Sequence, residues 1–162
     1  MDFNLLIWLF AMAITVHNFE EAIWLPAWSK TAGRFHHPIG IFEFRFAVIV
    51  LTVMAYIAAA LTMIGGKGSI GAYLISGYAL AMLINVVFPH LLATLVMRRY
   101  APGTATAIAL KLPITSMLLY QSFKEGFIDK SEFIYVGPLV VVGILLLIPG
   151  LFFMGRVLSS LK

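Results

Sequence analysis

Long apolar segments constrain the fold of this chain more than any other feature of its sequence. A helix that crosses the hydrocarbon core of a bilayer needs roughly 20 apolar residues. Five segments meet this requirement, at residues 3–25, 41–64, 70–97, 103–122 and 136–157. Hydrophobic residues make up 62% of the chain and charged residues 11%, whereas soluble domains have about 45–50% and about 25%. The sequence therefore predicts one all-α integral membrane domain over residues 1–162, a bundle of five transmembrane helices.

Proline and glycine residues set the expected ends and bends of these helices. Pro26 is expected to end the first segment, and the Gly-Gly-Lys-Gly-Ser run at 65–69 to form a tight turn after the second. Pro89 lies inside the third segment, and a kink is expected there because proline removes a backbone donor from the helix. The fourth segment is the least apolar, since it contains Lys111 and Pro113.

The distribution of basic residues predicts the orientation of the bundle. Lysine and arginine next to spanning helices mark the cytoplasmic side. With five helices, the first loop, the third loop and the C-terminus share one side, which has seven basic residues: Lys30, Arg34, Arg45, Arg98, Arg99, Arg156 and Lys162. The other side has three, Lys67, Lys124 and Lys130. We therefore expect an outside N-terminus and a cytoplasmic C-terminus, as in a multi-pass protein of the bacterial inner membrane.

The net charge of +4 does not indicate nucleic-acid binding, because the basic residues are scattered along the expected membrane edges. Attraction to anionic lipid headgroups accounts for them. The chain has no cysteine, which excludes disulfides and thiolate chemistry. The expected partner is a membrane lipid or another hydrophobic or amphiphilic small molecule.

Three ionisable residues lie inside the first apolar segment. His17, Glu20 and Glu21 have the spacing i, i+3, i+4, which places side chains on one helical face. Ionisable side chains at membrane depth are costly and mark functional sites by default. His17 lies nine residues before Pro26, at a depth of about 13 Å.

A second histidine is expected at the same level. His90 lies eight residues before Arg98, at a depth of about 12 Å from the same side. We therefore expect His17, Glu20, Glu21 and His90 to line one polar pocket that opens to the cytoplasm. Three further residues are candidates to support it: Asn85, as a partner of a ligand or as a polar contact between helices, and Glu43 with Arg45, at the start of the second helix.

Imidazole and carboxylate groups together favour a divalent metal, with zinc or iron expected here. His17, Glu20, Glu21 and His90 are the candidate ligands, and a glutamate that is not a ligand, Glu20 or Glu21, would act as catalytic base on bound water. This arrangement would suit a metal-dependent hydrolase or oxidase acting on a lipid.

The chain also resembles a known family of small multi-pass membrane proteins, the HXXEE-motif family. Its H-x-x-E-E motif matches residues 17–21, its second histidine matches His90, and its Y-x-P-G motif matches residues 100–103. The resemblance supports the choice of site residues and adds Tyr100 as a hydroxyl donor at the mouth of the pocket. It implies no particular reaction, because the family has no assigned activity. The Y-x-P-G motif itself is expected to form a turn with proline at an early helical position.

Two other functions fit the same residues. Two adjacent carboxylates in a low dielectric cannot both ionise cheaply, so the pair could act with His17 as a metal-free acid and base, as in a lipid isomerase or cyclase. Buried Asp, Glu and His chains also form proton relays in transporters. A transporter needs a polar path to the other side, and beyond Asn85 the third segment offers only Ser76, Tyr73 and Tyr78.

Overall fold

The computed structural model describes residues 1–33 and 37–161, and every regular element in this part of the chain is helical. Arg34 and Lys162, two of the basic residues counted above, lie outside the described residues. In chain order the elements are α1 (Phe3–Ser29), α2 (Ile41–Gly65), α3 (Ile70–Asn85), η2 (Val86–Leu91), α4 (Leu92–Met97), α5 (Thr104–Thr106), η3 (Ala107–Lys111), α6 (Leu112–Lys124) and α7 (Lys130–Ser160).

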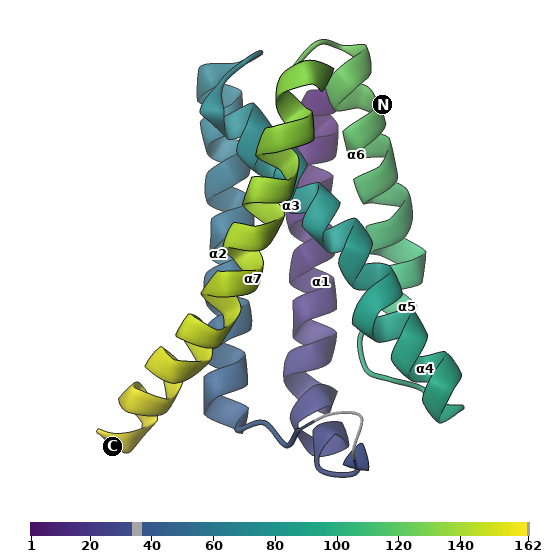
Figure 1. The fold of residues 1–162 in the computed structure, drawn as a ribbon, viewed down its shortest axis with the longest axis vertical. Coiled ribbons are helices and arrows are strands. Elements are labelled where there is room, and N and C mark those ends of the chain that lie inside the picture. The colour runs from purple at the N-terminus through teal and green to yellow at the C-terminus, as the bar shows by residue number, and fades with distance from the viewer. Residues whose placement is uncertain (34–36, 162) are drawn as a thin grey trace.

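Four described helices are long and apolar enough to cross a membrane: 3–29, 41–65, 70–97 and 130–160. The remaining predicted segment is also helical and comprises α5, η3 and α6. Figure 1 shows α1 at the centre of the bundle, with α2 and α6 beside it and α7 crossing α3. The N-terminus and the C-terminus lie at opposite ends of the molecule.

The first and third helices differ in their response to proline. Pro26 does not end α1, which continues to Ser29, so His17 lies twelve residues, or about 18 Å, from the end of its helix rather than about 13 Å. The predicted kink at Pro89 is confirmed, because Phe88 has the non-helical backbone angles φ −125° and ψ 119°. This break separates α3 from α4 and turns the His90 side chain into the bundle.

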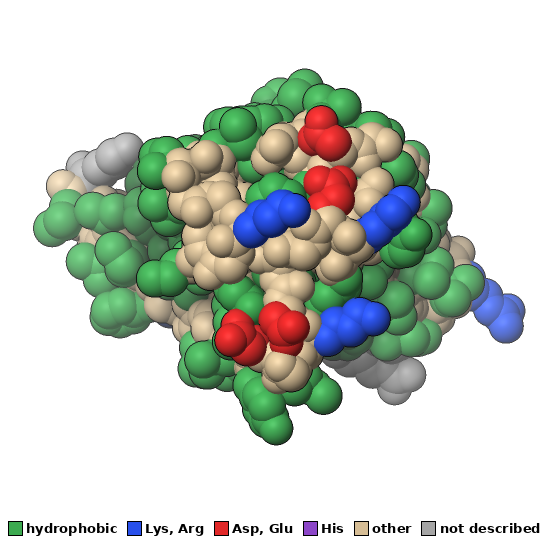
Figure 2. All heavy atoms as spheres, turned by 90° about the horizontal axis from the view of Figure 1, so that it is seen from above, with side chains coloured by type: hydrophobic (Ala, Val, Ile, Leu, Met, Phe, Trp, Pro, Cys, Tyr) green, Lys and Arg blue, Asp and Glu red, His purple; other side chains and the backbone are tan. Residues whose placement is uncertain are grey.

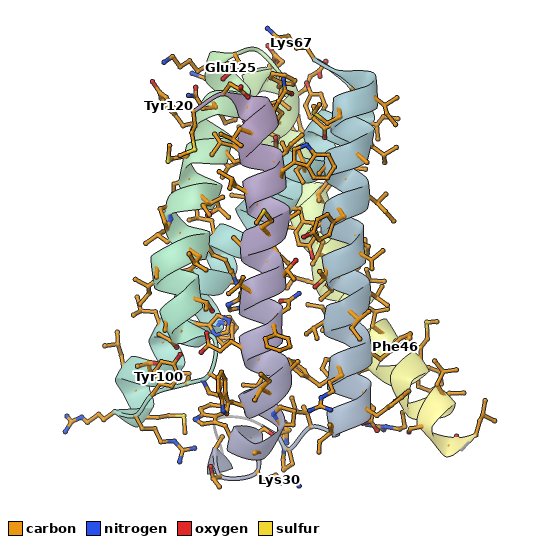
Figure 3. All side chains as sticks on the ribbon, turned by 180° about the vertical axis from the view of Figure 1, so that it is seen from behind. Lys30, Phe46, Lys67, Tyr100, Tyr120 and Glu125 are labelled. Carbon is orange, nitrogen blue, oxygen red and sulfur yellow. The ribbon has the colours of Figure 1, made fainter. Side chains whose placement is uncertain are left out.

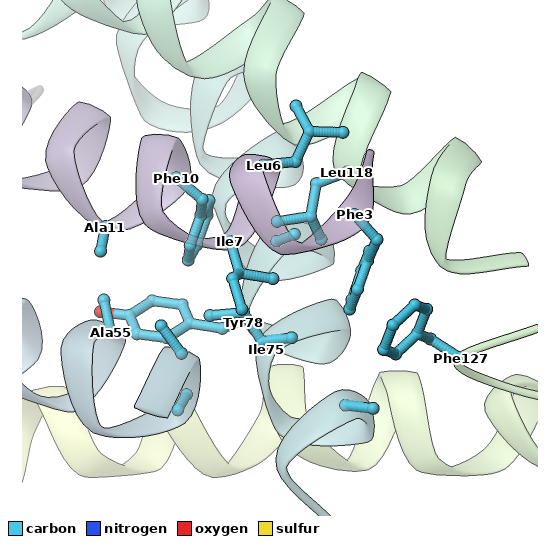
Figure 4. Packing of buried hydrophobic residues seen from close by; sticks show 14 of the residues in the cluster. Phe3, Leu6, Ile7, Phe10, Ala11, Ala55, Ile75, Tyr78, Leu118 and Phe127 are labelled. Atoms are coloured by element: carbon cyan, nitrogen blue, oxygen red, sulfur yellow. The ribbon is translucent and has the colours of Figure 1, made fainter. Parts of the chain in front are cut away.

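One hydrophobic cluster fills the half of the bundle near the N-terminus. Phe3, Ile7 and Phe10 of α1 pack with Ile75 and Tyr78 of α3, and Figure 4 shows their side chains interleaved. Phe10 and Tyr78 meet edge to face at 5.6 Å between ring centroids. Because this half is packed with apolar side chains, the buried ionisable residues are confined to the other half.

The charged side chains lie mainly at the two ends of the bundle. Figure 2, viewed onto the end that holds the N-terminus, shows acidic and basic side chains together, with hydrophobic side chains around them. Lys67 and Glu125 mark this end in Figure 3, and Lys30 and Tyr100 mark the other. An apolar belt between two polar ends is the form expected of a protein that spans a bilayer.

At Gly71 the backbone of α3 packs closely on the backbone of α2. A Cβ atom at this position would lie 2.4 Å from backbone atoms of Leu61 and Thr62. We predict that Gly71→Ala lowers the free energy of unfolding by about 1–3 kcal/mol through overpacking. The measurement is thermal or denaturant unfolding in detergent.

Gly143→Ala is the matched control, since a Cβ at this helical position has nothing within 4 Å. The control should unfold like the wild type or at a slightly higher temperature, because alanine favours helix over glycine. Equal unfolding of the two variants would contradict the close packing of α3 on α2.

Candidate functional site

The two glutamates that follow His17 in α1 have different partners. Glu21 Oε2 is 3.5 Å from His17 Nε2. Glu20 instead contacts the segment that begins at Tyr100: its Oε1 accepts hydrogen bonds from the Tyr100 hydroxyl and, at 2.9 Å, from the Gly103 amide. The expectation of three side chains on one face is therefore too simple, because adjacent helical residues point about 100° apart.

The kinked third helix supplies the second histidine. His90 Nε2 lies 3.5 Å from Glu21 Oε1, so Glu21 has one imidazole near each carboxylate oxygen. The two rings meet edge to face with their centroids 4.8 Å apart. His17 and His90 are 1% and 3% exposed, which places the whole contact inside the protein. The structure thus brings together His17, Glu21 and His90 from two helices.

Lys111 completes the cluster, and the sequence reasoning did not include it in the site. Its side chain is fully buried, with Nζ 3.0 Å from His17 Nε2 and in a hydrogen bond to Asn85 Oδ1. The signal that could have identified it was already present: a lone lysine in an apolar segment falls under the same rule as His17. Lys111 lies in the least apolar of the five segments, where it lowers the hydrophobicity and gives no indication of its partners.

Asn85 joins the lysine to the second histidine. Its Oδ1 accepts from Lys111 Nζ and lies 3.2 Å from His90 Nε2. Asn85 therefore has both roles that the sequence suggested: it is a polar contact between helices, and it is a partner of a candidate ligand, His90. Four groups from α1, α3, η2 and η3 converge on one point.

Helix α5, which follows the turn at residues 100–103, contacts the other edge of the His17 ring. Nδ1 of His17 is 2.9 Å from the Thr106 hydroxyl, which donates to Glu20 Oε2 at 2.6 Å. A hydroxyl that donates its proton to Glu20 must accept from the ring, so Nδ1 of His17 carries the proton. Nε2 then presents its lone pair to Lys111 and Glu21. The sequence did not indicate a role for Thr106, because threonine is common in apolar helices.

Gly103 brings the backbone of this turn against both imidazoles. It has φ +89°, and a Cβ at this position would lie 2.7 Å from Cε1 of His90 and 2.9 Å from Cε1 of His17. The turn is also tied to α4, where Thr94 Oγ1 accepts a hydrogen bond from the Ala101 amide at 3.2 Å. Pro102 precedes this glycine, so the proline stands in the turn and not at an early helical position, since α5 begins at Thr104.

Tyr100 lies at the end of the bundle, in the same turn (Figure 3). Its hydroxyl donates to Glu20 and accepts from the Ala105 amide at 3.2 Å. Loss of hydration and the hydrogen bond to the Glu20 carboxylate raise the pKa of Tyr100. The tyrosine therefore stays protonated and keeps donating to Glu20 across the physiological pH range.

Glu43 and Arg45 lie at the start of α2, away from the cluster. Arg45 is exposed, and its Nε donates to the carbonyl of Ala22 at 3.2 Å. Within residues 1–33 and 37–161, no hydrogen bond or ion pair joins either side chain to His17, Glu20, Glu21 or His90. The structure does not bring these two candidates to the pocket.

A cavity of about 260 Å³ adjoins the cluster. His17, Glu21 and Asn85 are among its polar residues, and most of its wall is apolar, with Phe44, Ile148 and Phe152 among the residues that line it. Such a space suits a molecule with a small polar group at one end and a hydrocarbon body.

The donor set fits a divalent metal in spacing. Ligands at about 2.0–2.2 Å from a tetrahedral zinc are about 3.3–3.6 Å apart. Glu21 Oε2 lies 3.5 Å from His17 Nε2, and its other oxygen, Oε1, lies 3.5 Å from His90 Nε2. The nearest ligand atoms of all three residues lie within 4.8 Å of one another, and two histidines with one carboxylate also suit iron. Glu20 is not part of this set. Lys111 faces the lone pair of His17 that a metal would need.

The chain is similar to known proteins over the region that contains the cluster. The model of the family described as proteins of unknown function with an HXXEE motif matches residues 8–118. The chain belongs to this family. It is also 43% identical over 150 residues to the uncharacterized protein YrkK of Bacillus subtilis (strain 168), covering 93% of this chain and 95% of that protein. No solved structure matches the chain. The matched region contains His17, Glu20, Glu21, His90 and Lys111.

We predict that Gly103→Ala disrupts the site. The added methyl group would press on both histidine rings, and alanine disfavours φ +89°. The expected result is a large change in the histidine ring signals in NMR spectra, together with a lower unfolding temperature.

Gly126→Ala is the control, since Gly126 has φ +71° but nothing within 4 Å of a Cβ. It carries the same backbone strain without the contact to the rings. The close packing of the turn on the histidines would be disproved by unchanged ring signals in Gly103→Ala, or by equal changes in both variants.

Proposed function

We propose that the chain crosses the bacterial inner membrane five times, with the N-terminus outside and the C-terminus in the cytoplasm. The support is the alternation of the helices between the two ends and the charge at those ends. The described basic residues at the end that holds the cluster are Lys30, Arg45, Arg98, Arg99 and Arg156. The opposite end mixes three lysines with acidic residues. The first set fits the cytoplasmic side.

We further propose that the protein is an intramembrane enzyme that performs acid–base chemistry on a lipid or another amphiphile. The observation that carries this proposal is the fully buried Lys111, which touches His17 and Asn85, two residues that also line the mostly apolar cavity. A lysine kept in hydrocarbon surroundings needs compensating partners, here the Glu21 carboxylate and two neutral acceptors. Such groups can remove a proton from a substrate and return one to another atom.

In this scheme each residue has a separate task. Glu21 faces the cavity and is the candidate base, and Lys111 with His17 supplies and receives protons beside it. Glu20 receives hydrogen bonds from Tyr100, Gly103 and Thr106, so it acts on His17 as a positioning residue. An isomerase that shifts a double bond, or a cyclase, needs only these proton transfers.

The apolar half of the bundle favours an enzyme over a proton-coupled transporter. Beyond the cluster, Phe10, Ile14 and Leu118 are fully buried between His17 and the N-terminal end. A transport path would have to cross this packed region, which extends from Ile14 to Phe3, about 16 Å along α1.

The proposal is tested by solvent isotope exchange. Purified protein is incubated with bacterial lipid extract in D2O, and lipids are analysed by mass spectrometry for deuterium bound to carbon. We expect incorporation with the wild type and a loss of about 10²-fold or more in Glu21→Gln and Lys111→Met, as for removal of a catalytic acid or base.

The double variant Glu21→Gln/Lys111→Met removes both charges and guards against unfolding caused by one unpaired charge. Glu132→Gln, at the opposite end, is the control and should incorporate deuterium like the wild type. Absence of incorporation with the wild type, or equal incorporation with all folded variants, would contradict the proposal.

A metal-dependent hydrolase or oxidase is the second candidate, favoured by the cluster of His17, Glu21 and His90, whose ligand atoms lie within 4.8 Å of one another. These residues would hold zinc or iron, which would polarise the substrate or activate water. We predict for this candidate that Glu21→Gln and His90→Asn lose the metal, while Glu20→Gln retains it. Elemental analysis of purified protein is the measurement, and a metal-free wild type would reject this candidate.

A further inference from the structure

A groove separate from the cluster runs along the outer surface between α1 and α2. Its volume is about 510 Å³, and its wall is mostly apolar, with Phe19, Ile23, Ile49 and Val53 among the residues that line it. Phe19 and Ile49 are 67% and 62% exposed, so the groove faces the surroundings of the bundle. Figure 3 shows α1 and α2 side by side on this face.

The long axis of the groove lies along the helices. On α2 the lining residues extend from Arg45 to Val53, and on α1 from Ile23 to Thr15. Each stretch covers nine residues, a rise of about 12 Å from the first to the last. The polar side chains within it are already paired: Thr15 lies 3.1 Å from the Tyr56 hydroxyl, and Asn18 donates to Thr52 at 2.8 Å. A hydrocarbon chain parallel to the helices would therefore meet an apolar wall.

Arg45 is the one charged residue among those that line the groove. It stands five residues into α2, next to Phe46, which Figure 3 labels near the end of that helix. Its Nε donates to the Ala22 carbonyl, which fixes the guanidinium at the groove. Among the described residues no carboxylate pairs with it, so its terminal N–H groups are available for an external anion.

We propose that this groove binds a phospholipid with an anionic headgroup, the phosphate on Arg45 and one acyl chain along α1 and α2. The charge at one end and the apolar wall along the bilayer normal match the two parts of such a lipid, and arginine is well suited to bidentate phosphate binding. Asn18 and Val48 line both this groove and the cavity of the cluster. The bound lipid thus lies on the outer side of the wall that closes the cavity.

Native mass spectrometry of the purified full-length protein tests the proposal. The probes are phosphatidylglycerol and phosphatidylcholine with identical acyl chains, added in equal amounts. We expect the wild type to retain phosphatidylglycerol preferentially and Arg45→Gln to reduce this preference about fivefold, the effect of one basic residue near a lipid surface. Ala22→Leu, which fills the groove and keeps the arginine, should weaken binding of both lipids.

Arg156→Gln is the control, since Arg156 is an exposed basic residue of α7 that does not line the groove. It should keep the wild-type preference. Equal loss in Arg45→Gln and Arg156→Gln would show attraction to net charge and overturn the site, as would unchanged binding in Arg45→Gln and Ala22→Leu. Glu21→Gln should retain the preference, so lipid binding is tested independently of acid–base catalysis.

Discussion

The burial of Lys111 is the constraint on which the arrangement of the site depends. An ammonium group inside an apolar bundle is stable only when neighbouring groups replace the water it has lost. Here the replacements are His17 Nε2 and Asn85 Oδ1, and the Glu21 carboxylate adds a charge interaction at longer range. Because these partners come from α1 and α3, the lysine holds η3 against both helices at one depth.

Glu20, on the other side of His17, is also stabilised by neighbouring groups that replace water. Glu20 is satisfied by the Tyr100 hydroxyl, the Gly103 amide and Thr106. The H-x-x-E-E and Y-x-P-G motifs therefore form one structure, in which the turn compensates Glu20 while Glu21 contacts the two histidines. This division leaves Glu21, and not Glu20, with a place at the cavity.

The prediction of apolar helices from the sequence succeeded because membrane thickness demands long uninterrupted segments. The nearness of His17 and His90 was also predicted, from residue counts to the expected helix ends, although the count for His17 used Pro26 and α1 ends at Ser29. The kink at Pro89 followed from the missing backbone donor. The sequence did not reveal that α1 runs through Pro26, because whether a proline ends a helix depends on what packs around it.

By itself the sequence determined the helical class and predicted that His17 and His90 lie near one level beside the glutamates of the first helix, because these follow from hydrophobicity and helical periodicity along the chain. Tertiary structure alone decided that Glu20 turns to Thr106 and Tyr100, that Lys111 enters the cluster, and that Arg45 stands at an outer groove. These outcomes depend on the rotation of each helix about its own axis. Packing against neighbouring helices sets this rotation, and the pattern of residues along the chain does not reveal it.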